Sequence, residues 1–335
     1  MVRLRSRDRG IALILALLVL VLLIVLVGQM AIGTRQDRVL AENRVADLQN
    51  TYGARAGYHR AALVLQADLE LAAEVDSLGE RWAQPIDFEL GQAKVSTLIL
   101  DCERFISLAQ LVNDKGEVNP PVAAQLRRLV RALRHPPDTA DRIIDYIDAD
   151  NKGSYESRAR NERLMNAEEL LRVEGLAPET LYGGTIAGEV RKGLLDFVTV
   201  WPRVAAPGGA TATPGAVNVN TAPQEVLEAL SDEMTPALAG AVAAFRMTPG
   251  EDGRPQGFKK VEDLKSVPGL GALYEGIAAS CVVKASTFEI RARSTVRNVE
   301  KAWVFVAQRG QKGLTLLSQQ RLNDFATAKP PDVDE

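Results

Sequence analysis

Four acidic side chains gather in the segment DYIDADNKGSYE, residues 145 to 156, and their spacing favours metal chemistry. Asp145 and Asp148 are three residues apart and would share one face of a helix, whereas Asp150 begins a loop. An Asn-Lys-Gly turn then leads to Glu156. Calcium takes about six to eight oxygen ligands, and this arrangement could supply several of them. The sequence predicts a calcium site with Asp148, Asp150 and Glu156 as ligands; the alternative is a helix end whose carboxylates are solvated.

The other reactive residue types argue against an enzyme. Two histidines and two cysteines are too few for a zinc cluster of the usual ligand count (His59, His135, Cys102 and Cys281). The sequence has no Walker lysine motif and no G-x-G-x-x-G, so a nucleotide enzyme is not expected. Paired acids can cut glycosidic bonds, but the chain has few aromatic residues for stacking on sugars and no second acid site. We therefore predict a protein without catalytic residues.

An apolar segment near the start of the chain predicts a membrane helix. Residues Ile11 to Val27 are all apolar, and no charged residue stands between Arg9 and Arg35. As a helix with a rise of about 1.5 Å per residue, this span crosses a hydrocarbon layer of roughly 30 Å. The basic stretch before it keeps the first ten residues in the cytoplasm and sends the rest of the chain outward. We therefore assign residues 11–34 to a transmembrane helix.

Helix-compatible sequence continues beyond the apolar segment without a proline until Pro85. Apolar residues recur in it at three- and four-residue steps or their sum, which indicates an amphipathic helix: Val45, Leu48, Tyr52, Ala56 and Leu63. We expect one long helix whose first half lies in lipid and whose second half packs through these residues on a soluble domain. The alternatives are an uncleaved signal anchor and a signal peptide that is cut near QMAIG.

The basic leader at 1–10, its glycine, the apolar helix and the amphipathic extension resemble the class III leader of the type IV pilin and type II secretion pseudopilin superfamily. The resemblance implies that a prepilin peptidase cuts between Gly10 and Ile11, and that Ile11 becomes the methylated N-terminus. Most such subunits carry glutamate at the fifth mature residue, where it is thought to neutralise the amine of the subunit ahead. This chain has Leu15 there. Because an unpaired carboxylate in lipid is costly, the absence implies a subunit at the tip.

Short β segments are predicted on both sides of a long central region. Two strands are expected near Phe88–Leu90 and Lys94–Leu100. In FEIRARSTV, residues 288–296, apolar and polar side chains alternate, which predicts one buried and one solvated face. KAWVFVAQ and LTLLSQQR follow a turn near Arg297–Glu300 and add further strands. The end of the chain, 323–335, is polar and Pro-rich and is expected to be disordered.

The central region reads as a helical block. Its candidate helices are Val122–Arg134, Thr139–Ala149, Asn166–Val173, Ala222–Leu230, Pro236–Arg246 and Lys260–Val267. A loop is expected over residues 206–216 by composition. The expected fold is α+β, a pilin-like long N-terminal helix with a small antiparallel sheet, interrupted by a large helical insertion. We assign 35–109 and 281–322 to the pilin-like domain, and 110–280 to the inserted helical domain with its helix-hairpin-helix-like segment.

The segments VNVNTAPQEVLEAL and GFKKVEDLKSVPGL in this block resemble the helix-hairpin-helix modules of DNA-binding proteins. Such modules hold phosphate through backbone amides of a glycine-rich hairpin and through nearby basic residues. Between Leu230 and Leu238, however, SDEMTPA stands where a glycine-rich hairpin is expected. From Ala216 to Ser280 acidic residues outnumber basic ones nine to five, so we expect a structural scaffold and no nucleic-acid partner.

Four motifs, in this order along the chain, resemble the minor pseudopilin K family of type II secretion systems: IIDYIDAD, NAEELLRVEGL, LLDFVTVWP and VNVNTA. The leader without its fifth-position glutamate fits the same family. The resemblance implies a minor pseudopilin at the pseudopilus tip, needed for its assembly and for export of folded proteins across the outer membrane. It implies a single-pass inner-membrane protein with a periplasmic C-terminal domain. Its implied partners are minor pseudopilins I and J, other pseudopilins and the prepilin peptidase.

The resemblance bears on the calcium prediction, and the periplasmic location bears on the two cysteines. Family members bind calcium in the helical domain at a similar acidic segment, although a Gly-Ala-Glu-Asp stretch usually follows there and KGSYESRARNE does not reproduce it. Cys102 and Cys281 flank the insertion at its entry and exit, and a disulfide persists in an oxidising periplasm. The two cysteines are therefore expected either to tie the two ends of the insertion together or to be two buried thiols.

Two other functions fit parts of the sequence. One is a membrane-anchored DNA-binding or uptake protein that uses the helix-hairpin-helix-like segment. The other is a minor pilin of a type IV pilus, because the leader and the apolar helix are common to both kinds of fibre.

Overall fold

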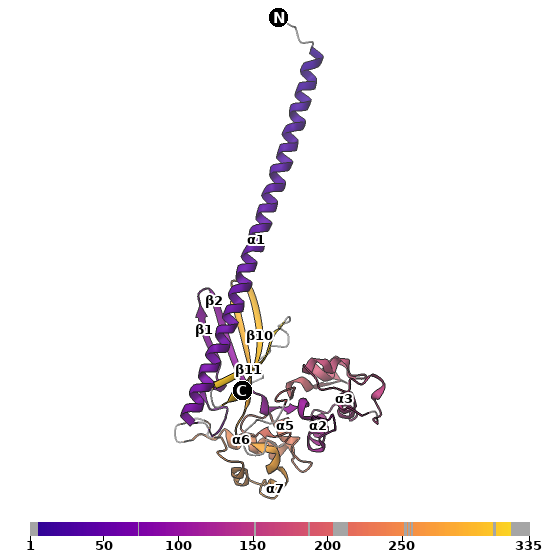
Figure 1. Cartoon of the computed structure of the whole chain (residues 1–335), viewed down its shortest axis with the longest axis vertical. Coiled ribbons are helices and arrows are strands. Elements are labelled where there is room, and N and C mark those ends of the chain that lie inside the picture. The colour runs from indigo at the N-terminus through magenta and orange to yellow at the C-terminus, as the bar shows by residue number, and fades with distance from the viewer. Residues whose placement is uncertain are drawn as a thin grey trace.

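The computed structural model describes residues 6–72, 74–150, 152–186, 188–203, 214–250, 253, 255, 257–310 and 313–322. The tail that the sequence predicts at 323–335 lies outside these residues, as does most of the loop at 206–216. The remaining chain forms a long helix, a sheet against its second half, and an inserted block beyond the sheet (Figure 1).

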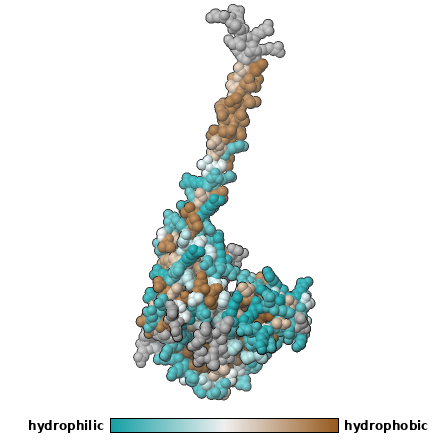
Figure 2. All heavy atoms as spheres, viewed as in Figure 1, coloured by the Kyte–Doolittle hydropathy of each residue, from teal (hydrophilic) through white to brown (hydrophobic). Residues whose placement is uncertain are grey.

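Helix α1, Ser6–Ala72, is 67 residues long and continuous through QMAIG. Its first half extends away from the rest of the chain and carries the apolar surface that is brown in Figure 2. Among the described residues it is the one helix long and apolar enough to cross a membrane. The predicted transmembrane segment at 11–34 therefore lies on a helix that can serve as a single-pass anchor.

The sheet has five antiparallel strands in the order β1-β2-β9-β10-β11. Their bounds are Ile86–Leu90, Ala93–Asp101, Thr287–Val296, Val299–Gly310 and Gly313–Leu322. Along β9 the alternation read from the sequence is confirmed, because residues 288, 290, 292, 294 and 296 are buried while those between them are partly exposed. Because β2 pairs directly with β9, the residues between them leave and re-enter the sheet at adjacent strands.

The second half of α1 lies on one face of this sheet, but through a face of the helix that the sequence did not predict. The apolar residues read as the packing stripe point away from the sheet, and Val45, Leu48, Tyr52 and Leu63 are between 54% and 66% exposed. We call these four residues the exposed stripe. The side buried on the sheet carries mostly small residues: Ala46, Asn50, Gly53, Ala54, Gly57, Ala61 and Leu65.

The close approach of α1 to the sheet explains why the face with small residues is the buried one. A Cβ placed on Gly57 would meet Ala292 Cβ at 3.1 Å and Val95 Cγ1 at 3.3 Å, and one on Gly53 would meet Val95 Cγ2 at 3.2 Å. Helix backbone lies so near the strands at these points that only glycine fits. Packing density, rather than the size of the apolar side chains, therefore decides which face is buried.

Adding one methyl group at this contact tests it. We expect Gly57→Ala to destabilise the full chain by about 1–3 kcal/mol, because the overpacked helix must shift from the sheet. Gly33→Ala is the matched control, since nothing lies within 4 Å of its Cβ position. Thermal unfolding in detergent micelles measures both variants. Equal melting temperatures for the two would contradict the close contact.

The insertion has its own hydrophobic core, which runs from Ile106 to Cys281 and so slightly exceeds the predicted 110–280. Its α-helices are α2 Pro120–Ala132, α3 Thr139–Ile147, α4 Pro178–Tyr182, α5 Gln224–Glu228, α6 Pro236–Arg246 and α7 Tyr274–Ile277. Three two-stranded sheets complete it: β3 Ile106–Ser107 with β6 Val198–Thr199, β4 Gly184–Ile186 with β5 Glu189–Arg191, and β7 Val217–Asn218 with β8 Cys281–Val282. The block lies at the end of the sheet away from the N-terminus (Figure 1).

Two predicted helices of the insertion form 3₁₀ turns instead. They are η5 Ala167–Arg172 and η7 Val261–Ser266, in place of 166–173 and 260–267. Gly175 and Gly269, both with positive φ, follow them after a few residues. Each of these segments is a 3₁₀ turn of six residues, the short form in which 3₁₀ structure usually occurs. The predicted helix 222–230 is likewise reduced to the five residues of α5.

Candidate functional site

The structure brings the three predicted calcium ligands together. Helix α3 ends at Ile147, and Asp148 follows in an extended conformation that turns the chain out of the helix. The 3₁₀ turn η4, Glu156–Arg158, brings the chain back. Carboxylate oxygens of Asp148, Asp150 and Glu156 then lie within 4.8 Å of one another. We call this cluster the acidic loop.

Electrostatics in the acidic loop favour a bound cation. Asp148 Oδ1 and Glu156 Oε2 are buried without a hydrogen-bond partner among the described residues. Burial, and then the carboxylates of Asp150, Glu156 and Asp145, raise the pKa of Asp148 to about 6. Crowded carboxylates with unused oxygens suit a hard, oxygen-liganded ion such as calcium, so the residues present fit that group.

Backbone amides hold the acidic loop in shape. Gly153 N donates to Glu156 Oε1 at 2.8 Å, and Lys152 N donates to Asp150 Oδ1 at 2.9 Å. Tyr155 N donates to Asp145 Oδ2 at 2.9 Å, which places the fourth acid of the segment under the turn. Asp145 therefore positions the loop, while the other three acids offer oxygens to a ligand.

A second polar cluster joins the insertion to the sheet, where the chain leaves after Asp101 and returns at Ala285. We call this place the neck. Asn218 Nδ2 donates to Asp101 Oδ2 at 2.7 Å and to the Asp76 carbonyl at 3.1 Å. Thr221 Oγ1 donates to the same Asp101 oxygen at 2.6 Å. All of these side chains are buried, so the VNVNT residues of the insertion are fixed to the last residue of β2.

Glu103 completes the neck on its other side. Its carboxylate accepts from Ser286 N at 2.9 Å and from Thr287 N at 3.3 Å, at the start of β9. Burial, and then the neighbouring Asp101, raise the pKa of Glu103 to about 8. Sequence reasoning did not identify Asp101 and Glu103 as functional, although acids directly after an apolar strand are an unusual pattern that could have drawn attention to them.

The segment that resembles a DNA-binding module has a structural use within the insertion. Arg246 is buried and donates to the carbonyls of Val219 and Ala222 at 3.0 and 2.7 Å. Asn220 bonds the backbone of Phe258 twice, at 2.9 Å through Nδ2 and at 2.6 Å through Oδ1. These hydrogen bonds join the two halves of the segment to each other. The motif therefore has a structural role that does not require phosphate binding.

Cys102 and Cys281 are two free, buried thiols in this structure, which is the second of the two expected alternatives. Cys281 packs in the core of the insertion, whereas Cys102 lies at the end of β2, beside Glu289 and Glu103. Burial raises the pKa of both thiols, that of Cys281 to about 12, so neither is a ready nucleophile.

The predicted processing residues, Gly10 and Ile11, lie inside α1. Ile11 and Leu15 are 59% and 57% exposed, as expected of a helix surface that meets lipid or other helices. Leu15 is the fifth residue after Gly10.

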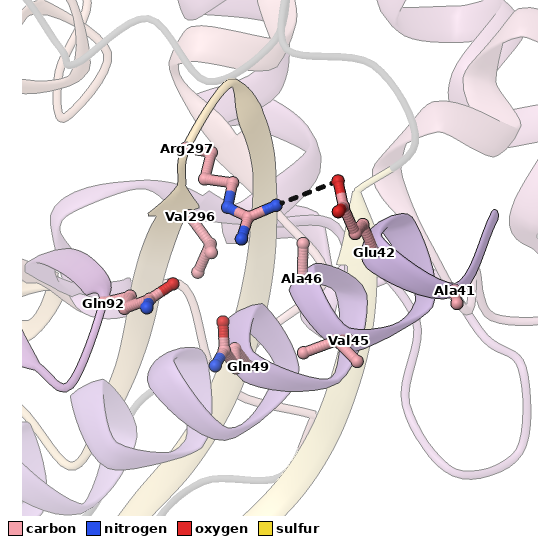
Figure 3. A pocket seen from close by; sticks show the side chains of 8 residues that line it. All are labelled: Ala41, Glu42, Val45, Ala46, Gln49, Gln92, Val296 and Arg297. Carbon is pink, nitrogen blue, oxygen red and sulfur yellow. Dashed lines mark hydrogen bonds and ion pairs between the residues drawn. The ribbon is translucent and has the colours of Figure 1, made fainter. Parts of the chain in front are cut away.

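A hollow of about 190 Å³ lies between α1 and the turns at the end of the sheet nearer the N-terminus (Figure 3). Its walls are mostly apolar and include Val45 and Val296, and an ion pair of 3.3 Å joins Glu42 to Arg297 across it. Arg297 adopts a positive φ of 53° in the tight turn between β9 and β10. The hollow has no group that could do chemistry beyond this pair, so we regard it as a packing feature.

Comparison with known proteins agrees with this architecture. Residues 217–283 match the family described as type II secretion system (T2SS), protein K. This range includes the VNVNT residues of the neck and the segment that resembles a DNA-binding module. The fold is similar to a chain in the crystal structure of the GspK-GspI-GspJ complex from the enterotoxigenic Escherichia coli type 2 secretion system. That match has a TM-score of 0.64 and 19% identity, and it covers 85% of this chain and 99% of the other. No curated protein matches the chain by sequence.

A long N-terminal helix on an antiparallel sheet, with one helical insertion between adjacent strands, is the pilin-like α+β fold. Residues 217–283 of this chain match the type II secretion protein K family, and the fold of the chain is consistent with that match. The type IV minor pilin and the DNA-uptake protein, which fitted parts of the sequence, are not the family that the match identifies.

The raised pKa of Glu103 predicts a pH dependence of stability. A carboxyl group whose pKa is higher in the folded than in the unfolded state loses favourable folding energy as pH rises between the two values. The free energy of unfolding of the full chain, measured with chelator present, should therefore fall from pH 5 to pH 8. Glu103→Gln keeps one acceptor oxygen and removes the ionisation, so its slope should be smaller.

Exposed Glu70 of α1 supplies the control, because Glu70→Gln should leave the slope of the parent protein unchanged. Denaturant unfolding in detergent at several pH values gives all three curves. If Glu103→Gln kept the full slope, the neck carboxyl group would not be the origin of the pH dependence.

Proposed function

We propose that this chain is the tip subunit of the type II secretion pseudopilus, anchored in the inner membrane by α1 with its sheet and insertion in the periplasm. It is needed there for pseudopilus assembly and for export of folded proteins across the outer membrane. The observation that carries the proposal is the insertion, whose neck segment matches the protein K family and which lies at the far end of a pilin-like body. The basic leader supports the orientation, and cleavage between Gly10 and Ile11 by a prepilin peptidase follows from the same resemblance.

The tip position is supported at both ends of the molecule. At the far end the insertion covers the sheet's end, so another subunit of the same shape has no free surface to stack on (Figure 1). In the membrane, Leu15 replaces the carboxylate that would pair with a subunit ahead. A carboxylate without that partner would be costly in lipid, so its loss is favourable only for a terminal subunit.

The exposed stripe supports an assembly with other pseudopilins. Four large apolar side chains on one side of α1 stay in water, although the opposite side is buried on the sheet. The hollow shares Val45 with the stripe, so a partner helix laid on the stripe would also cover the hollow. Large apolar side chains exposed along one side of a helix are typical of a surface that packs on a partner. The partners we propose are minor pseudopilins I and J, by analogy with the GspK-GspI-GspJ complex.

Co-purification tests this interface. The full chain should bring the I and J subunits of its own secretion system with it from detergent extracts. Leu48→Lys places a charge in the middle of the exposed stripe and should weaken the complex about tenfold or more, since about 1.4 kcal/mol suffices for that. Val190→Lys is the matched control, because Val190 is an apolar residue of the insertion, in β5, and is 87% exposed.

Two results would count against the assembly proposal. The first is failure of the parent chain to retain either I or J, which would remove the partners. The second is full retention by Leu48→Lys, which would move the interface away from the exposed stripe.

We further propose that the acidic loop binds calcium through Asp148, Asp150 and Glu156. The ion would neutralise three crowded carboxylates and tie the turn after α3 to η4, so its effect is structural. The buried oxygens without hydrogen-bond partners support this assignment.

Glu156→Gln should lower calcium affinity at least about tenfold, because it removes one of the three charged ligands while keeping the side-chain size. Isothermal titration of the detergent-solubilised full chain gives the affinity. Calcium at about 100 times its Kd should stabilise the parent by about 2.7 kcal/mol and the variant by much less. Exposed Glu179→Gln on α4 is the control. Equal affinity in Glu156→Gln and the parent would contradict the assignment.

A further inference from the structure

A second group of carboxylates lies at the neck, on other elements than the acidic loop. Asp68 belongs to the last turns of α1, and Asp76 and Glu80 follow in the loop that leads toward β1. Carboxylate oxygens of these three residues lie within 4.8 Å of one another. Asp76 is fully buried, and the other two are partly buried. We call this group the neck triad.

The cation that touches the neck triad is Arg309 of β10. Its Nη1 lies 3.3 Å from Asp68 Oδ2, and its Nη2 pairs with Asp76 Oδ2. Glu80 instead accepts hydrogen bonds from neutral donors, Ser77 at 3.1 Å and Trp82 Nε1 at 2.6 Å. Three carboxylates therefore share a single guanidinium among these contacts, and the cluster has an excess of negative charge.

Asp76 gives a second, independent observation that points to a ligand. Its Oδ2 is occupied by Arg309 and by Ala285 N, the latter at 2.7 Å. Its Oδ1 is buried and has no hydrogen-bond partner among the residues that the structure describes. Leaving an ionised oxygen without a partner in the interior is costly, and native proteins avoid it unless an ion or a water supplies the contact.

We propose that the neck triad binds a hard divalent cation of the calcium class, held by Asp68, Asp76 and Glu80. All three ligands are carboxylates, and no histidine or cysteine lies in the cluster, which favours calcium over transition metals. The ion joins the end of α1 to the loop that carries Asp76, and through the Asp76 carbonyl to Asn218 of the insertion. It fixes the insertion relative to the long helix.

Trp82 provides a direct probe, because its indole lies against the triad. Terbium replaces calcium in carboxylate sites and emits when a nearby tryptophan transfers energy to it. Under excitation selective for tryptophan, the full chain in detergent should give saturable terbium emission that calcium displaces. The measurement is made in a Glu156→Gln background, so that the acidic loop does not contribute.

Three variants in that background decide the assignment. Asp68→Asn and Glu80→Gln should each weaken terbium and calcium binding about tenfold or more. Trp82→Phe should abolish the sensitised emission while calcium binding by titration calorimetry persists, which no indirect loss of folding would produce. Circular dichroism confirms that each variant is folded, and a variant that fails to fold is replaced by Asp68→Ser or Glu80→Ser.

Absence of sensitised terbium emission from the folded Glu156→Gln protein would overturn the proposal. Arg309 would then be the only cation that offsets the negative charge of the triad. Terbium and calcium affinities of Asp68→Asn and Glu80→Gln equal to that of the Glu156→Gln protein would overturn it as well. Neither result depends on the assembly with I and J, because the co-purification measures a different surface, the exposed stripe of α1.

Discussion

Hydrogen bonds to the Asp101 carboxylate are the constraint on which the arrangement of this protein depends. Asp101 is the last residue of β2, and the chain enters the insertion immediately after it. Asn218 and Thr221, more than a hundred residues later, both donate to one of its oxygens. A buried carboxylate must be fully satisfied, so the insertion cannot pivot without exposing that charge to an apolar interior. This requirement holds the insertion in a fixed orientation relative to the sheet.

Helix α1 divides its surface between two kinds of packing. Its sheet face uses small residues, and glycine at 53 and 57 lets backbone and strands approach closely. Its opposite face keeps large apolar side chains in solvent. A soluble monomer gains nothing from that exposure, whereas a subunit that joins other helices gains from burying it. The same helix can therefore pack closely on its own sheet and still expose an apolar face that a partner could cover.

The insertion owes its stability to a core that is separate from the one under α1. Its core residues, from Ile106 to Cys281, form one cluster, while Phe288, Ile290 and Phe305 belong to the cluster between sheet and helix. Two cores joined by a polar neck behave as two bodies with a fixed junction. Charged groups collect at that junction and at the acidic loop, which is where cations are proposed to act as structural links.

The sequence by itself determined the elements whose pattern is local. An uninterrupted apolar run required the anchor helix, alternation along 288–296 required a strand with one buried face, and the spacing of Asp148, Asp150 and Glu156 required them to lie near one turn. Only the tertiary structure decided which face of α1 is buried, because that depends on how closely the sheet approaches and not on hydrophobic period. The neck likewise depends on contacts between residues as far apart as Asp76 and Ala285. No local pattern encodes such pairs, since the chain brings them together only when it folds.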